Sequence, residues 1–224
     1  MEDVLSQAPL FVALNDEAAS ALRSTMVEVN ISRGDDLFTE GDPGEHLYVI
    51  VKGKIKLGTT SGDGRESLLA VLGPGEMFGE LSLFDPGPRT ATATAITDSV
   101  VLGLGHEDLV PWLSGRPVVS QELLKALAQR LRRTNEALAD LVFSDVPGRV
   151  AKALIELSEK FGTRRDDGLY VSHDMTQEEL AQLVGASRET VNKALAEFAQ
   201  RGWVRLEPRA ILLVDTDRLT RRAG

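Results

Sequence analysis

A long stretch without helix breakers divides the chain into two different halves. From Ser120 to Phe143 the sequence contains neither glycine nor proline. Leucines recur in it at alternating steps of three and four, the spacing of a heptad seam, at Leu124, Leu127, Leu131, Leu138 and Leu141. Thr134 takes the one remaining seam position. A helix of this length would extend roughly 36 Å. The stripe suits either a partner helix, most simply that of a second copy, or packing within the chain, and by itself it favours neither.

The residues before this helix have the texture of a β-domain. From Val29 to about Leu104, short β-prone runs alternate with glycine-containing turns. The runs are residues 47–51, 55–57, 68–72 and 92–102, and the turns are residues 41–44, 61–64 and 73–75. Many short strands without a long helix between them predict a β-sandwich or jelly roll. The opening, Val4 to Val27, has helical spacing of apolar residues, with Asn15 or Asp16 as the N-cap.

After the long helix, Ser144 to Pro147 predict a break and a new helix. Asp145 can cap that helix, and Pro147 suits its first turn because the missing N–H would be unpaired there anyway. We place a hinge and a domain boundary at this point. The remainder alternates helical patterns with two β-prone pieces, residues 169–171 and 210–214.

Residues 176–195 predict two short capped helices joined by a glycine. Thr176 and Glu179 form a capping box, and Gly185 supplies the positive φ of a tight turn. Ser187 caps the second helix, whose inward positions are Val191, Ala194, Leu195 and Phe198. This pattern is typical of a helix-turn-helix. Residues 203–206 and 210–213, separated by residues 207–209, predict a hairpin wing beside it.

The outward face of the second helix carries the residues expected to read DNA. Arg188, Glu189, Asn192 and Lys193 project from its start, where a recognition helix meets base edges in the major groove. Arginine matches guanine in a bidentate manner, and glutamate accepts from cytosine. We include the two N-cap residues, Thr176 and Ser187, in this predicted DNA-binding set. The alternative is a solvated polar face, against which the capped Ser-Arg-Glu-Thr-Val run favours DNA binding.

The charge distribution is compatible with DNA contact at one end of the chain. The net charge is −9, which by itself argues against nucleic acid as a partner. Residues 1–120, however, have 8 basic and 18 acidic side chains, whereas residues 186–224 have 8 basic and 5 acidic ones. The acidity is therefore concentrated in the first half, and the last segment is locally basic.

Residues 77–92 contain the groups expected to bind an anion. A short helix starting near Gly79 would offer backbone N–H groups. Glu80 can accept from a ribose hydroxyl, Arg89 can fork onto phosphate oxygens, and Thr90 adds a hydroxyl. A salt bridge between Glu80 and Arg89 across a loop is the purely structural alternative.

Several of these motifs together resemble a known family. Phe-Gly-Glu-Leu-Ser-Leu-Phe at residues 78–84, followed by Pro-Arg-Thr-Ala at 88–91, resembles the phosphate-binding cassette of cyclic-nucleotide-binding domains. Residues 40–44, 47–50 and 53–57 resemble the glycine-punctuated hairpins of the same domain. With residues 145–150 and 187–191, the similarity covers nearly the whole chain. The sequence resembles the cyclic-AMP receptor protein and fumarate–nitrate regulator family, and within it the actinobacterial cyclic-AMP receptor proteins.

The resemblance implies an α+β fold in three parts. Residues 1–118 would form a jelly-roll cyclic-nucleotide-binding domain, residues 119–143 a dimerisation helix, and residues 144–224 a winged helix-turn-helix. Cyclic AMP would be the effector, without a metal. Its ligand-binding residues would be Gly79, Glu80, Leu81, Arg89 and Thr90, together with Thr134 and Asn135, which match positions that meet the adenine, one of them from the partner subunit.

The resemblance also implies the partners. These are double-stranded DNA with palindromic, TGTGA-like sites, a second copy of the chain, and RNA polymerase, with no membrane. Arg188, Glu189 and Lys193 match the family's three base readers, but Lys193 stands where the best-known members have arginine, which leaves the outermost base preference open. The alternative function keeps the DNA reader and gives the β-domain another ligand, such as a cyclic dinucleotide, or none.

Composition excludes several other functions. The chain has no cysteine, which removes disulfides and iron–sulfur clusters and fits a reducing cytoplasm. No apolar run approaches the length of a membrane span, and the N-terminus is acidic where a secretory signal would be basic. No catalytic serine elbow, phosphate loop or clustered histidine–carboxylate pair is present, so we expect a cytoplasmic protein that is not an enzyme.

Overall fold

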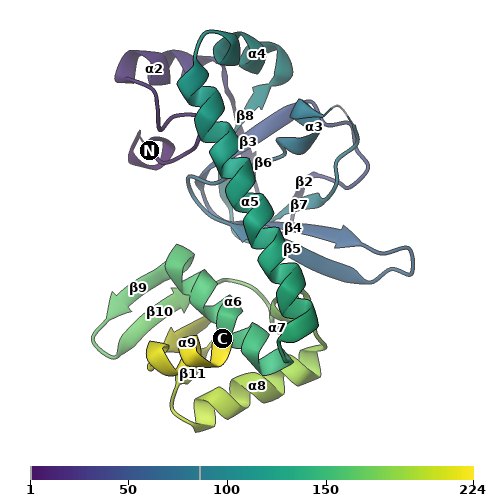
Figure 1. Cartoon of the computed structure of the whole chain (residues 1–224), viewed down its shortest axis with the longest axis vertical. Helices are drawn as coiled ribbons and strands as arrows, with labels where there is room; N and C mark the ends of the chain where they lie inside the picture. The colour runs from purple at the N-terminus through teal and green to yellow at the C-terminus, as the bar shows by residue number, and fades with distance from the viewer. Residues whose placement is uncertain (1, 86) are drawn as a thin grey trace. The chain divides into compact units, whose positions relative to one another are not determined.

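The computed structural model describes residues 2–85 and 87–224 (Figure 1). The chain divides into two compact units, one formed by Met1–Gly64 with Leu69–Arg133 and the other by Arg65–Leu68 with Thr134–Gly224. The first is built mainly of β-strands and the second mainly of helices, so the predicted α+β class is confirmed.

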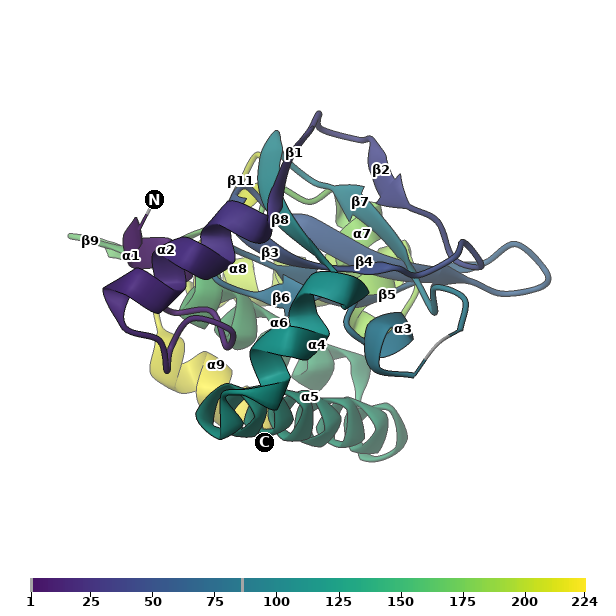
Figure 2. The same ribbon diagram turned by 90° about the horizontal axis from the view of Figure 1, so that it is seen from above.

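Two four-stranded antiparallel sheets make up the β-rich unit. One has the order β1 (Val27–Ile31), β8 (Ser99–Gly105), β3 (His46–Lys52), β6 (Met77–Phe78). The other has the order β2 (Asp36–Phe38), β7 (Thr92–Ala95), β4 (Ile55–Thr60), β5 (Glu66–Leu72), and Figure 2 shows both orders. Ile50, Phe78 and Val101 of the first sheet pack in one cluster with Ile55 and Ala93 of the second. The predicted sandwich is therefore confirmed.

One predicted strand is wrong. The β-prone run at residues 92–102 is divided between β7 and β8, which belong to different sheets. The chain turns between them, where the Ile96 N–H donates to the Lys54 carbonyl and the Asp98 carboxylate accepts from the Arg33 N–H. Residue propensity alone does not show this corner, because the residues on both of its sides favour strands.

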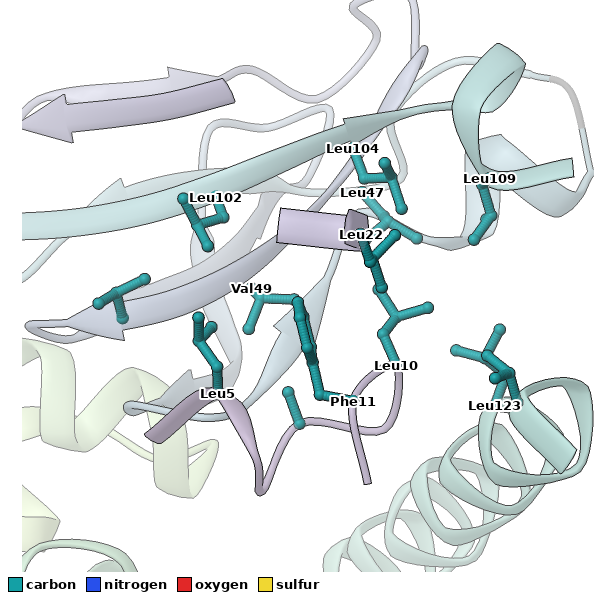
Figure 3. Packing of buried hydrophobic residues seen from close by; sticks show 13 residues of the cluster. Leu5, Leu10, Phe11, Leu22, Leu47, Val49, Leu102, Leu104, Leu109 and Leu123 are labelled. Carbon is teal, nitrogen blue, oxygen red and sulfur yellow. The ribbon is translucent and has the colours of Figure 1, made fainter. Parts of the chain in front are cut away.

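The N-terminal segment covers the outer face of the first sheet, as Figure 3 shows. The single helical segment predicted for residues 4–27 is instead α1 (Glu2–Leu5), a series of turns, and α2 (Asp16–Thr25), after which Val27 begins β1. The Asn15 cap is confirmed, since its side chain accepts from the Ala18 N–H. Buried Leu10 and Phe11 pack with Leu47 and Leu104 of the sheet and with Leu109 of α4 (His106–Ser114). They also pack with Val119 and Leu123 of α5 (Pro117–Phe143).

Helix α5 spans Pro117–Phe143, so it begins before the predicted Ser120 and ends at the predicted residue. Its buried positions, Val119 and Leu123, are not those of the leucine seam. The seam residues Leu124, Leu131, Leu138 and Leu141 are 65%, 62%, 62% and 53% exposed, and Leu127 is half-buried. Most of the seam is therefore exposed in the described part of the chain. None of the helices in the described residues is long and apolar enough to cross a membrane.

The second unit joins four helices to a four-stranded sheet. The helices are α6 (Val146–Phe161), α7 (Gln177–Val184), α8 (Arg188–Gln200) and α9 (Thr216–Ala223). The sheet has the order β11 (Val204–Glu207), β12 (Ala210–Leu213), β10 (Gly168–Ser172), β9 (Gly162–Arg165). Strands β10 and β12 and the β11–β12 wing hairpin were predicted. Strand β9 was not predicted, because all of its residues are exposed and do not alternate between buried and exposed positions. The guanidinium carbon of its Arg165 lies 3.4 Å from the Tyr170 ring centroid of β10.

The predicted break after α5 is confirmed at Asp145. Its side chain accepts from the Gly148 N–H at 2.9 Å and caps α6, and Pro147 lies in the first turn. Arg222 of α9 donates to both carboxylate oxygens of Asp145, at 2.8 and 2.6 Å. The hydrogen bond from Arg222, followed by that from the Gly148 N–H, lowers the pKa of Asp145 below its usual value.

We expect Asp145→Ala to lower the free energy of unfolding by about 1 kcal/mol, because the helix loses its cap. The folded-state pKa is lowered, so the contribution of the ionised carboxylate is present above the ordinary aspartate pKa and is lost as the pH falls through the folded-state value. Urea denaturation between neutral pH and pH 3 measures this. Asp145→Asn is the matched control, since it keeps a capping oxygen and should lose only the pH-dependent part. An Asp145→Ala variant as stable as the parent would contradict the capping role.

Candidate functional site

The cassette begins with a glycine that no other residue can replace without strain. Gly79 follows β6 with φ +78°, a conformation that L-residues rarely adopt. A Cβ atom at this position would lie 2.9 Å from Arg89 Nη1 and 3.1 Å from the His46 carbonyl oxygen. The predicted short helix is present as α3 (Leu81–Phe84), with Glu80 at its N-cap, so it starts after the predicted Gly79.

Arg89 is a buried cation surrounded by carbonyls and aromatic rings. Its side chain is 4% exposed. Nη1 donates to the Gly79 carbonyl and Nη2 to the His46 carbonyl, both at 2.8 Å, and the guanidinium carbon lies 4.1 Å from the Phe38 ring centroid. Burial lowers the pKa of Arg89, against the smaller opposing effects of Tyr48, Asp42 and Glu80. The buried Nε–H has no hydrogen-bond partner in the described part of the chain.

Glu80 is also buried, with 1% of its surface exposed, and has a partner that the sequence did not suggest. Its Oε1 accepts from Arg130 Nη1 of α5 at 2.7 Å. The other carboxylate oxygen, Oε2, is buried without a hydrogen-bond partner among residues 2–85 and 87–224. The Glu80 carboxylate thus pairs with Arg130 and not, as the structural alternative required, with Arg89. The only sequence signal that could have indicated Arg130 as a pocket residue is its position one helical turn before Thr134.

These residues line one pocket, whose walls are Phe38, Leu57, Gly79, Glu80, Leu81, Ser82, Arg89, Thr90, Ala91 and Arg130. The set includes all five predicted cassette residues. Apolar side chains adjoin a buried cation with a spare donor and a buried carboxylate with a spare acceptor. Such a pocket suits a small anion that also has a hydroxyl group. Thr134 and Asn135 are not among the lining residues and lie exposed on α5.

The helix-turn-helix forms as its capping signals predict. Thr176 Oγ1 accepts from the Glu179 N–H at 3.1 Å, while the Glu179 carboxylate accepts from the Thr176 N–H at 2.7 Å. Gly185 adopts the left-handed conformation, with φ 66° and ψ 46°. Ser187 accepts from the Thr190 N–H and caps α8. The four predicted inward residues, Val191, Ala194, Leu195 and Phe198, are buried.

The predicted base readers lie at the exposed start of α8. Arg188 is exposed, and Glu189 and Lys193, with side chains 77% and 75% exposed, form an ion pair at 2.6 Å. Asn192 is half-buried, and its Oδ1 is a buried acceptor without a partner in the described residues. Thr176 and Ser187 are exposed as well, but their hydroxyls are engaged in capping. The start of α8 therefore exposes two basic side chains, Arg188 and Lys193, and one acidic side chain, Glu189.

Comparison with known proteins assigns a class to each half. Residues 28–114 match the cyclic nucleotide-binding domain, and residues 148–222 match the Crp-like helix-turn-helix domain. The pocket lies within the first of these ranges except for Arg130, and the capped helices lie within the second. The molecule is therefore a DNA-binding transcription regulator with a cyclic-nucleotide-binding domain.

Full-length relatives give the family. The chain is 53% identical over 223 residues to the CRP-like cAMP-activated global transcriptional regulator of Mycobacterium tuberculosis, with 100% of both chains covered. It is 39% identical over 201 residues to the cyclic AMP receptor protein of Thermus thermophilus, with 90% of each covered. The crystal structure of the Thermus thermophilus catabolite activator protein, 36% identical, covers 96% of this chain and 98% of its own, with a TM-score of 0.56.

The chain belongs to the cyclic-AMP receptor protein and fumarate–nitrate regulator family, as its motifs predicted. The family consists of transcription regulators and not of enzymes.

The geometry of Gly79 predicts a site-specific cost of substitution. Gly79→Ala should lower the free energy of unfolding by about 1–2 kcal/mol for the positive φ alone, with an additional cost from the contacts with Arg89 and His46. Gly64→Ala is the matched control, because Gly64 has φ +83° but no atom within 4 Å of the added Cβ. Urea denaturation compares the two. Equal losses would mean that close packing at Gly79 contributes nothing.

Proposed function

We propose that this regulator is a homodimer that binds cyclic AMP and, in response, palindromic DNA with TGTGA-like half-sites. One observation carries the nucleotide assignment. Arg89 Nε, a donor, and Glu80 Oε2, an acceptor, are buried without described partners, and both residues line one pocket. An unpaired buried polar group costs about 1–3 kcal/mol, so a ligand that satisfies both stabilises the site.

A cyclic nucleotide has the complementary groups. Its phosphate oxygens are anionic acceptors for Arg89 and for the exposed hydroxyl of Thr90. Its ribose hydroxyl is a donor for Glu80, whose other carboxylate oxygen is held by Arg130. Gly79 admits the close approach of Arg89, and Leu81 adds an apolar wall.

The choice of cyclic AMP rests on the relatives. Two of them are named for activation by, or reception of, cyclic AMP. In keeping with this family, we assign the adenine to Thr134 and Asn135, one of them contributed by the partner subunit. Both side chains are exposed on α5 and thus accessible to such a ligand.

The exposed seam of α5 supports the homodimer. Leu124, Leu131 and Leu138 are each more than 60% exposed. Burying a large aliphatic side chain contributes about 1.5–3 kcal/mol, so a second copy of α5 across a twofold axis would stabilise the pair. On this basis residues 1–118 sense the nucleotide, residues 119–143 dimerise, and residues 144–224 bind DNA.

Two recognition helices related by a twofold axis favour a palindrome with half-sites about 34 Å apart. Arg188, Glu189 and Lys193 would contact bases, with Thr176, Ser187 and Asn192 beside them. A protein that binds promoters in this way works in the cytoplasm and contacts RNA polymerase.

The nucleotide assignment is tested at Arg89. Arg89→Lys keeps the charge but not the planar fork, so affinity for cyclic AMP should fall about tenfold to a hundredfold, and Arg89→Leu should abolish binding. Calorimetric titration with cyclic AMP, cyclic GMP and cyclic di-GMP measures this, with melting curves to verify folding. Arg116→Leu is the control, because Arg116 also stacks on an aromatic ring, 3.9 Å from the Trp112 centroid, but is not among the pocket-lining residues. Parental cyclic AMP binding by Arg89→Lys, or a parent that binds only the dinucleotide, would refute the assignment.

The DNA assignment is tested at Arg188. Arg188→Ala should lose about 1–3 kcal/mol of binding free energy on a TGTGA-like palindrome and relax the guanine preference. Arg201→Ala is the control, since Arg201 is the C-cap residue at the far end of α8 and pairs with Glu197. Fluorescence anisotropy with palindromic and random duplexes separates the two contributions. An equal loss on both duplexes would show that Arg188 contacts only phosphate.

A further inference from the structure

One arginine outside both proposed binding sites connects three backbone carbonyls. Arg149, in the first turn of α6, is half-buried. Its Nη1 donates to the Ser144 carbonyl at 2.8 Å and its Nε to the Val184 carbonyl at 3.0 Å. Its Nη2 donates to the Gly185 carbonyl at 3.2 Å. All of the donor nitrogens of this guanidinium are therefore used on backbone oxygens.

These carbonyls belong to the ends of two different helices. Ser144 directly follows α5, while Val184 is the last residue of α7 and Gly185 is its C-cap. The last carbonyls of a helix have no partner within it and carry the negative end of its dipole. A planar cation with donors in several directions suits two such ends at once.

Gly185 is also the turn residue of the helix-turn-helix. It is followed by Ala186 and by Ser187, which caps α8, so the orientation of Gly185 decides where α8 starts. An apolar contact accompanies the polar one, because a Cβ at Gly185 would lie 2.9 Å from Leu141 Cδ2 of α5. The end of α5 and the turn are thus joined by two side chains, Leu141 of α5 and Arg149 of α6.

We propose that Arg149 is a positioning residue that fixes the start of α8 to the end of α5, so that a movement of this helix end reaches the recognition helix. The link itself requires only the contacts above. Its use in nucleotide response rests on the proposed function.

Other charged pairs at this corner have different partners. Arg222 donates to Asp145, and Lys152 donates to Asp140 of α5. Their described bonds hold α6 to α9 and to α5, whereas those of Arg149 reach the helix-turn-helix. Arg222 therefore offers a matched control with the same change of side chain.

Arg149→Lys tests the positioning role in the full-length chain. Lysine keeps the charge but places its donors on one nitrogen, so it can serve one helix end at a time. Without nucleotide or DNA, hydrogen exchange of the Gly185, Ala186 and Ser144 amides, which bond to α7 and α5 carbonyls in the parent, should become about tenfold faster. Exchange in β3 should not change. Arg222→Lys should leave Gly185 and Ala186 at the parental rate.

The same variant should bind DNA less selectively. We expect the ratio of palindromic to random DNA affinity to fall about tenfold, with unchanged calorimetric affinity for cyclic AMP and an unchanged melting midpoint. Parental exchange and a parental ratio would overturn the proposal, as would an equal effect of Arg222→Lys. If the parent itself does not respond to nucleotide, the proposed function fails, but the exchange result still decides the role of Arg149.

A second measurement does not depend on whether a variant folds. In the parent labelled with ¹⁵N-arginine, the Arg149 Nε–H should exchange with water at least tenfold more slowly than that of exposed Arg188. Equal exchange of the two would overturn the proposal, because it would mean that the three carbonyl contacts do not hold the guanidinium.

Discussion

The unbroken backbone hydrogen bonding of α5 is the constraint on which the functional parts of this regulator depend. The 27 residues of α5 contain no glycine, and their one proline, Pro117, is at the first position, where no helical hydrogen bond is lost. Val119 and Leu123 are buried against the β-sheet, Arg130 donates to Glu80 in the pocket, and the carbonyl of Ser144, directly after the last turn, accepts from Arg149. The helix thus supplies contacts to the β-sheet and to the pocket at one end and to Arg149 at the other.

The electrostatics of the pocket are local and not a property of the domain as a whole. An acidic β-domain is unfavourable for an anion, yet Arg89 is held with its charge balanced mainly by carbonyl dipoles and aromatic faces. Burial keeps this charge from being screened by solvent. The Glu80 carboxylate is paired with Arg130, and its interaction with Arg89 is one of the smaller contributions to the pKa of Arg89. The pocket therefore contains a buried cation and a buried carboxylate that are held by different partners.

In the DNA-binding domain, local electrostatic contacts are likewise decisive, and there they occur at the ends of helices. Capping side chains start α6, α7 and α8, and arginines stabilise helix junctions at Asp145 and at Gly185. Each cap contributes about 1 kcal/mol. Their joint effect is geometric, because they fix where each helix begins, and thereby which side chains of α8 face outward.

The sequence by itself determined the features that depend on neighbours within a few residues. The capping box of Thr176, the glycine turn at 185, the Asp145 cap and the cassette from Gly79 to Thr90 were all predicted, because their hydrogen bonds span three or four residues or their motif is contiguous. The tertiary structure alone decided the corner that separates β7 from β8, the pairing of exposed β9, and the partners of Glu80 and Arg149. Glu80 and Arg130 are 50 residues apart, and Arg149 and Val184 are 35 apart. Contacts at such separations leave no periodic trace in the sequence, since only the folded chain brings their atoms within hydrogen-bond distance.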